Sequence, residues 1–100
     1  MPTASYETLN KLTKRDLQSL FYVGRRLRLK DCYMGVVKNQ ERTVKEQKSY
    51  GYIMTCEDGR DSYMRFEPGN YILGKTCGNG YYEIGIYDSD DRLAAKYELL

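Results

Sequence analysis

The carboxylates of Asp88, Asp90 and Asp91 form the densest group of side chains in this sequence that could take part in chemistry. Their spacing matches the start of a calcium-binding loop, in which alternate residues supply oxygen ligands. Such a loop requires glycine at its sixth place and glutamate at its twelfth, where this chain has Leu93 and Leu99. The spacing therefore indicates a solvated turn, and we expect no bound calcium.

Thiol and imidazole chemistry is limited by the composition. The chain has no histidine, which removes the commonest general base and the Ser-His and Cys-His pairs that activate nucleophiles. Cys32, Cys56 and Cys77 are odd in number and form no C-x-x-C pair, unlike the even disulfide framework of small secreted proteins. We therefore expect reduced thiols in a cytoplasmic protein, with no metal site, no cofactor and no enzymatic activity.

Eleven tyrosines are the most unusual feature of the composition. Tyrosine combines a large apolar area with a polar tip, so it is favoured in contact surfaces. Asp58 and Gly59, between two alternating runs, predict a hairpin with a two-residue turn that pairs Ile53 with Met64 on the core face. The opposite face then carries the candidate partner-binding residues, which are Tyr50, Tyr52, Tyr63 and Arg65. The alternative is that a second packed layer, such as an N-terminal helix, covers this face.

A run of basic residues is the second candidate site. Between positions 11 and 48 there are eleven Lys or Arg and four Asp or Glu, whereas the chain from position 49 has five and nine. Alternate side chains of a strand lie about 7 Å apart, which is comparable to the spacing of phosphates along a nucleic acid. The candidate nucleic-acid-binding residues are the basic residues of this run and a tyrosine that could stack on a base, namely Arg25, Arg26, Arg28, Lys30 and Tyr33. The alternative is a charged face that keeps a sheet soluble.

The N-terminal part of the chain has the pattern of a short helix. Leu9, Leu12 and Leu17 fall in one helical stripe. Thr13 followed by Asp16 is typical of a capping box, in which each side chain bonds the backbone amide of the other residue. We expect the helix over about residues 14–23, because the glycine that follows is well suited to end it.

The rest of the chain alternates with the period of β-strands. Strands are expected at about 26–30 and 33–37, whereas the polar segment 38–49 is expected to be a loop or the tip of a long hairpin. A type II turn is expected at Pro68 and Gly69.

A second two-residue hairpin at Asn79 and Gly80 would pair Leu73 with Ile86. Residues 93–99 fit a strand or a helix, and we predict a strand because a turn precedes them. The expected fold class is α+β, with an N-terminal short helix packed on a twisted, barrel-like antiparallel meander of five or six strands.

These observations favour a single domain, residues 1–100, that binds a macromolecule. No apolar run approaches the roughly 20 residues of a membrane span, so no membrane association is expected. The leading hypothesis is a small adaptor or inhibitor of another protein. One version is a phage or mobile-element inhibitor of a host defence nuclease, similar in role to anti-CRISPR proteins. The alternative is a small nucleic-acid-binding domain that uses the basic strand and exposed tyrosines.

Overall fold

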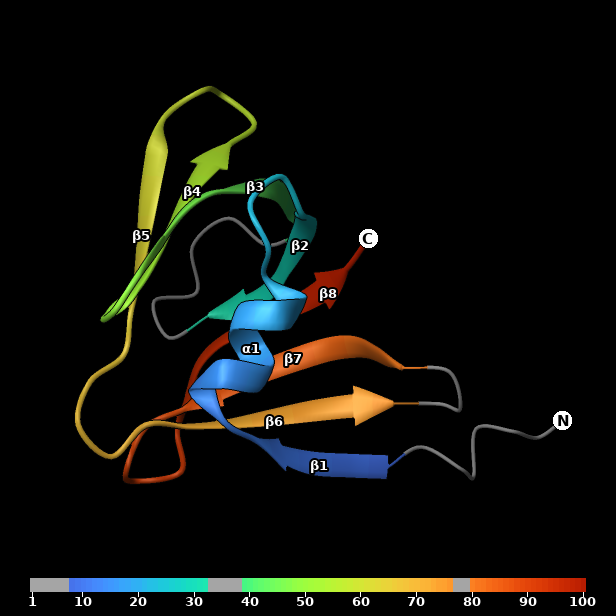
Figure 1. The fold of residues 1–100 in the computed structure, drawn as a ribbon, viewed down its shortest axis with the longest axis vertical. Coiled ribbons are helices and arrows are strands. Elements are labelled where there is room, and N and C mark those ends of the chain that lie inside the picture. Colours follow the sequence, from blue (N-terminus) through green and yellow to red (C-terminus); the bar gives the residue numbers. More distant parts are fainter. Residues whose placement is uncertain (1–7, 33–38, 77–79) are drawn as a thin grey trace, which may run out of the picture.

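A strongly curved antiparallel sheet surrounds one short helix (Figure 1). This arrangement is seen in a computed structural model, which describes residues 8–32, 39–76 and 80–100. Within these residues the elements follow one another along the chain as β1 (Thr8–Leu12), α1 (Lys14–Leu20), β2 (Arg26–Cys32), β3 (Gln40–Lys48), β4 (Gly51–Cys56), β5 (Asp61–Arg65), β6 (Tyr71–Thr76), β7 (Tyr81–Tyr87) and β8 (Leu93–Leu99).

Helix α1 begins where the sequence predicts. The backbone amide of Asp16 donates to Oγ1 of Thr13, and the amide of Thr13 donates to Oδ2 of Asp16, each over 3.0 Å. These bonds satisfy two amides that a helix start leaves without partners, and they hold the pKa of Asp16 below its usual range. The helix ends at Leu20, earlier than expected. There the side-chain amide of Gln47 donates to the carbonyls of Gln18 and Phe21, which fastens the helix end to β3.

The described strands form one sheet in the order β1-β6-β7-β8-β2-β3-β4-β5, and every pair is antiparallel. The sheet is open, because its two edge strands, β1 and β5, do not pair with each other. The expected α+β character is confirmed. The expected number of five or six strands is wrong, since eight are described, and the expected barrel-like form is wrong as well, since the sheet is open. The meander is also interrupted, since β2 pairs with β8 and β1 pairs with β6, both far away in sequence.

Two of the strands were not expected. Strand β1 lies in a segment whose leucine spacing favours a helix, and it pairs along its whole length with β6. Strand β3 occupies the polar segment that was expected to be a loop or the tip of a long hairpin, and the strand expected at 33–37 lies outside the described residues. Only Val44 in β3 is fully buried, but the strand has a pairing partner on both sides, β2 and β4. Its stability therefore comes from main-chain pairing rather than from an apolar pattern of its own.

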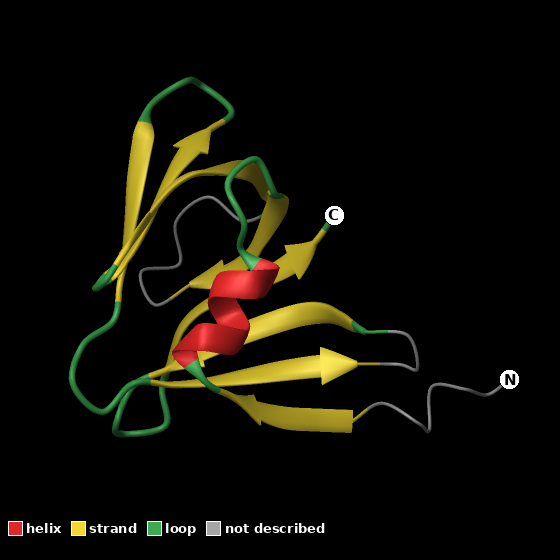
Figure 2. Ribbon diagram, viewed as in Figure 1, coloured by secondary structure: helices red, strands yellow, loops and turns green. Residues whose placement is uncertain are grey.

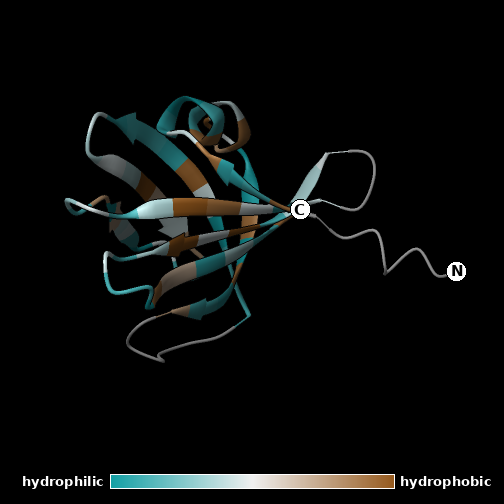
Figure 3. Ribbon diagram, turned by 90° about the horizontal axis from the view of Figure 1, so that it is seen from below, coloured by the Kyte–Doolittle hydropathy of each residue, from teal (hydrophilic) through white to brown (hydrophobic). Residues whose placement is uncertain are grey.

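The core lies between the helix and the concave face of the sheet (Figure 2). Leu17 and Phe21 are fully buried there. The ring of Phe21 meets the rings of Tyr52 and Tyr97 edge to face, with centroids 5.4 and 5.6 Å away. Burying one ring of this kind stabilises the fold by about 1.5–3 kcal/mol. Figure 3 shows hydrophobic segments in the middle of several strands and in the helix across them.

The hairpin between β4 and β5 has a three-residue loop instead of the expected two-residue turn. The amide of Cys56 donates to the carbonyl of Arg60 over 2.8 Å, and the amide of Gly59 donates to the carbonyl of Cys56 over 3.0 Å. Gly59 has φ +88°, as the last residue of such a loop requires. The register is consequently shifted by one residue, so Ile53 lies opposite Tyr63 rather than Met64.

The hairpin between β7 and β8 uses the same kind of loop. The amide of Asp88 donates to the carbonyl of Arg92, and Asp91 has φ +63° in the place that Gly59 takes in the other hairpin. The Oδ1 atom of Asp88 accepts hydrogen bonds from the amides of Asp90 and Arg92, so the acidic group serves the turn. The strand expected over residues 93–99 is confirmed as β8.

The hairpin between β6 and β7 also differs in register from the expected one. Leu73 lies opposite Gly85, and Ile72 lies opposite Ile86, with an irregularity near Thr76. The predicted turn residue Asn79 lies outside the described residues. The turn expected at Pro68 and Gly69 is confirmed, since Gly69 has φ +89° and the amide of Asn70 donates to the carbonyl of Glu67. No helix in the described part of the chain has the length and apolar character to cross a membrane.

Candidate protein-interaction surface

The outer face of the sheet near its β5 edge brings together three of the four predicted partner-binding residues. Tyr63 and Arg65 point outward from β5, and Tyr50 lies in the turn between β3 and β4. We call Tyr50, Tyr63 and Arg65 the Tyr63 surface. The strands position it because the antiparallel pairing of β4 with β5 places Arg65 opposite Gly51, directly after Tyr50.

The Tyr63 surface combines exposed aromatic rings with a guanidinium group. The side chain of Tyr63 is 63% exposed and that of Tyr50 is 45% exposed. The guanidinium carbon of Arg65 lies 5.0 Å from the centroid of the Tyr50 ring, which is a cation–π contact. Ile53 lies opposite Tyr63 in the neighbouring strand and is largely buried although it does not belong to the core cluster. The surface thus has an apolar base and polar tips.

Gly51 allows β4 to approach β5 closely beneath this surface. A Cβ atom at Gly51 would lie only 1.9 Å from the carbonyl oxygen of Met64 and 2.9 Å from Cα of Arg65. Its φ of +155° is also one that side-chain-bearing residues rarely adopt. Glycine at this position therefore determines where Arg65 stands relative to Tyr50.

Tyr52, the fourth predicted residue, is on the opposite face. It is only 4% exposed, and its ring packs edge to face against Phe21 and Phe66. Burial raises its pKa to about 12. The one-residue shift of the hairpin register explains the difference, because side chains alternate between the two faces of a sheet. Tyr52 is therefore a core residue, and the predicted face was wrong at this position.

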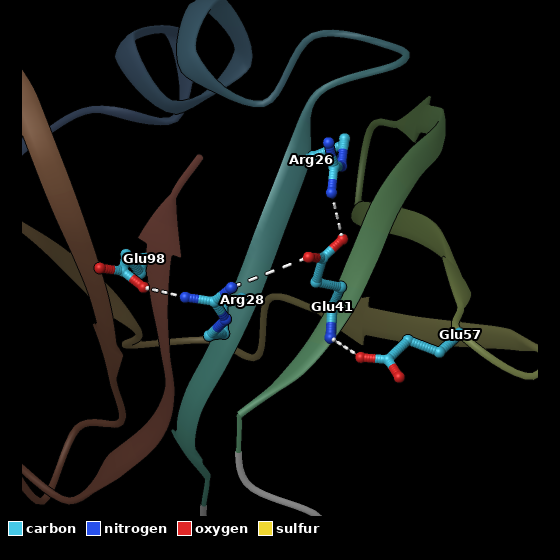
Figure 4. Close-up of polar contacts among 5 residues, drawn as sticks. All are labelled: Arg26, Arg28, Glu41, Glu57 and Glu98. Atoms are coloured by element: carbon cyan, nitrogen blue, oxygen red, sulfur yellow. Dashed lines mark hydrogen bonds and ion pairs between the residues drawn. The ribbon is translucent and has the colours of Figure 1, made fainter.

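The basic strand β2 is paired with carboxylates on both sides (Figure 4). The guanidinium of Arg26 lies 2.7 Å from a carboxylate oxygen of Glu41 in β3. Arg28 lies 3.1 Å from Glu98 in β8 and 3.7 Å from Glu41. The amide of Glu41 in turn donates to Glu57 over 2.7 Å. Two arginines of the predicted nucleic-acid site thus already have acidic partners.

The ion pair between Arg26 and Glu41 shifts the pKa values of both groups. The hydrogen bond from Arg26 holds the pKa of Glu41 below its usual range, and the same bond raises the pKa of Arg26. Glu41 therefore stays ionised in mildly acidic solution. At neutral pH the carboxylates cancel much of the positive charge that the sequence assigns to this face.

The other residues of the predicted basic site are dispersed. The guanidinium of Arg25 lies 5.3 Å above the ring of Tyr22 in the loop between α1 and β2, and its carbonyl accepts a bond from Val44. Lys30 is half-buried near the end of β2. Tyr33 lies outside the described residues. The four basic residues of the predicted site, all of which the structure describes, therefore do not form one continuous row of unpaired cations.

An inward-facing arginine was missed by the sequence analysis. Arg42 lies opposite Leu27, and its guanidinium donates to Oγ of Ser62 over 3.0 Å and to Gln40 over 3.5 Å. It also interacts with the hydroxyl of Tyr97, whose pKa burial raises to about 12. Arg42 is half-buried, and no pattern around it in the sequence indicates that it faces inward, since its sequence neighbours are polar.

Searches of protein-family models, curated proteins and solved structures find no match to this chain. The function therefore has to be argued from the surface itself. Cys32 and Cys56 are half-buried thiols, and Cys77 lies outside the described residues. Within residues 8–32, 39–76 and 80–100, no three His, Cys, Asp or Glu side chains are grouped so that they could hold a metal ion.

A cleft of about 360 Å³ lies between α1 and the turn that carries Tyr50. Phe66 and Tyr52 form part of its wall, and Lys14 extends over it with its ammonium group 5.1 Å from the centroid of the Phe66 ring. Lys48 also lines it and forms a 3.1 Å ion pair with Glu46. The cleft is thus a cationic, aromatic hollow on the helix side of the sheet, and the turn that carries Tyr50 separates it from the Tyr63 surface.

Proposed function

We propose that this chain is a non-catalytic protein-binding module, acting as an adaptor or inhibitor, and that its contact surface is the Tyr63 surface. The observation that supports this proposal most directly is the grouping of Tyr50, Tyr63 and Arg65 on the outer face of the sheet. Tyrosine and arginine are enriched among the residues that contribute most to protein–protein affinity.

The charge of the surface suggests the chemistry of the partner. The guanidinium of Arg65 contacts the ring of Tyr50, which leaves its charge available to a carboxylate. The proposed partner is therefore a protein that presents acidic side chains around an apolar contact. An inhibitor of a nucleic-acid-handling enzyme is the specific form of this function that the sequence suggests.

The nucleic-acid alternative has less support. Phosphate binding depends on cations that can release condensed counterions. Arg26 and Arg28 already contact Glu41 and Glu98. A bound phosphate would have to displace these carboxylates or tolerate their repulsion. The alternative is therefore not the function that the geometry favours.

The experiment that tests the proposed function is a capture assay with folded variants. The wild type, the Tyr63→Ala, Arg65→Ala double variant and a Tyr22→Ala control would be immobilised and exposed to a lysate of the cells that make the chain, with and without nuclease treatment. Tyr22 suits the control because it is 51% exposed and lies under Arg25, as Tyr50 lies under Arg65.

We expect a protein that binds the wild type and the control but not the double variant. With that protein purified, the affinity should fall at least about 30-fold in the double variant, which corresponds to about 2 kcal/mol. Equal binding to all three forms would refute the assigned surface. Binding that disappears on nuclease treatment would favour the nucleic-acid alternative.

A further inference from the structure

Strand β5 is an edge strand whose outer main-chain groups face away from the sheet. Among the described strands it pairs with β4 alone. The bonds from Cys56 to the Arg60 carbonyl and from Phe66 to the Tyr50 carbonyl bracket this pairing. In an antiparallel pair, every second residue of a strand forms main-chain hydrogen bonds with the neighbouring strand. The amides and carbonyls of Ser62 and Met64 are therefore bonded to β4 as well. The amides and carbonyls of the intervening residues therefore point to the open edge, and these residues are Asp61, Tyr63 and Arg65.

The side chains of these three residues are self-complementary. In an antiparallel pairing around a two-fold axis at Tyr63, each Tyr63 lies opposite the Tyr63 of the other copy. The same register places each Asp61 opposite Arg65 of the other copy, so both flanking pairs join opposite charges. The amides and carbonyls of Asp61, Tyr63 and Arg65 point to the open edge, so this register also lets them form hydrogen bonds with the other copy. The main-chain groups and the charged side chains therefore favour the same register.

We propose that β5 pairs with β5 of a second copy of this chain, in the register centred on Tyr63. The result is a two-fold symmetric dimer with one continuous antiparallel sheet. Figure 1 shows β5 at the outer side of the β4–β5 hairpin, where a further strand can be added. Within one copy Asp61 also forms an ion pair with Lys45, whose ammonium lies 3.1 Å from its carboxylate, so in the dimer this carboxylate is shared between Lys45 and Arg65 of the other copy. This inference does not depend on the proposed function.

The other edge of the sheet does not offer the same match. Strand β1 contains a single charged residue, Lys11, so no pairing of β1 with itself can bring opposite charges together. A lysine on an edge strand also opposes strand addition. The choice of β5 over β1 therefore follows from the sequence of the two edges.

The dimer has a consequence for the Tyr63 surface. Strand addition uses the main-chain edge and leaves the outer face open to a partner. The two Tyr63 surfaces, one from each copy, then lie side by side across the two-fold axis. An interface formed by two five-residue strands is smaller than the about 1,200 Å² typical of stable complexes, so the dimer should depend on concentration.

Charge exchange tests the register. In Asp61→Arg both flanking charges are positive, and in Arg65→Asp both are negative, so each variant alone should remain monomeric. An equal mixture restores both opposite-charge pairs and should dimerise at least as well as the wild type. Sedimentation equilibrium from about 10 μM to about 1 mM covers weak association. Leu9→Asp on β1 is the matched control and should dimerise like the wild type, because its charge lies on the other edge strand.

Amide exchange in the wild type provides a test that does not need folded variants. The amides of Tyr63 and Arg65 should become protected as the concentration rises, whereas those of Ser62 and Met64, which bond β4, should be protected at every concentration. A wild type that is monomeric at about 1 mM, or single-charge variants that dimerise like the wild type, would overturn the proposal. A mixture that stays monomeric while the wild type dimerises would also overturn it.

The two proposals fail in different ways. If Asp61→Arg no longer dimerises but still binds the partner protein, both proposals are supported, because the monomer still carries the Tyr63 surface. A wild type that dimerises but captures no partner would refute the proposed function alone. A wild type that captures a partner as a monomer up to about 1 mM would refute the dimer alone.

Discussion

Removing the carboxylates beside β2 should convert the outer face of the sheet into a nucleic-acid-binding surface. The change is the double variant Glu41→Gln, Glu98→Gln, which eliminates the acidic partners of Arg26 and Arg28 without altering side-chain volume. It raises the formal net charge by two from +2 and leaves two guanidinium groups without a paired carboxylate. Both groups lie on the outer face, so a single strand could reach them (Figure 4).

The expected effect follows from counterion release. Each phosphate contact on a single strand contributes a slope of about −0.7 to log affinity against log salt, so two new contacts steepen the slope by about 1.4. Between 50 and 200 mM salt, the double variant should therefore lose roughly sevenfold more affinity than the wild type. The wild type should bind more weakly than about 10⁻⁴ M at physiological salt. Fluorescence anisotropy with a short labelled single strand, repeated over a salt series, measures both quantities.

A variant with the same change in net charge separates local from global effects. Glu67→Gln with Asp90→Asn removes two negative charges from loops that do not contact Arg26 or Arg28. It should leave the salt slope near that of the wild type. An unchanged slope in the Glu41→Gln, Glu98→Gln variant would refute the argument that these carboxylates neutralise the basic strand.

Two further predictions concern stability. Gly51→Ala should lower the free energy of unfolding by at least about 2 kcal/mol, because the new Cβ would meet the Met64 carbonyl. Gly59→Ala should lower it by only about 1 kcal/mol, because the space around Gly59 is open. Urea denaturation measures both effects, and equal losses in the two variants would contradict this reasoning. The buried phenol of Tyr97 has its pKa raised to about 12 from 10, so its contribution to stability should be complete below pH 10 and be lost between pH 10 and 12. Unfolding measured against pH, with ultraviolet detection of tyrosinate, would show this loss. The loss should be smaller in a Tyr97→Phe variant, in which the buried phenol of Tyr52, whose pKa is also raised to about 12, still contributes.

The elements that the sequence predicted correctly have strong local signals. The Thr13 cap and its partner Asp16 define the start of α1 through bonds between residues three apart. Pro68 and Gly69 form a turn because each residue has an intrinsic backbone preference that fits it. In these places, the conformation depends little on the rest of the chain.

The elements that were missed depend on distant pairing. Strand β3 is polar apart from Val44, and only its neighbours β2 and β4 make it a strand. Strand β1 has leucines spaced as in a helix, but its pairing with β6 prevails over that local pattern. Local patterns carry no information about such partners, because what makes these segments strands is context supplied by residues distant in the sequence.

The candidate site shows how one residue in a loop changes a surface. The sequence around Asp58 and Gly59 fits both a two-residue and a three-residue loop, and the structure has the latter. The resulting shift exchanges the two faces of β4 and moves Tyr52 into the core. Tyr63 and Arg65 remain outside. The neutralising partner Glu98 was beyond prediction, because β8 meets β2 only through the fold.

The order of the strands in the sheet also has a consequence for the time course of folding. The pairs β3–β4, β4–β5, β6–β7 and β7–β8 join neighbours in sequence, so these hairpins can form as soon as their own residues exist. Strand β2 is different, since its register with β8 places Leu27 opposite Leu99. During synthesis, therefore, β2 can pair with β3 on one side, but its pairing with β8 on the other side is complete only after residue 99 has been added. The two halves of the sheet should join in a late step after the local hairpins have formed, and that step should limit the rate of folding.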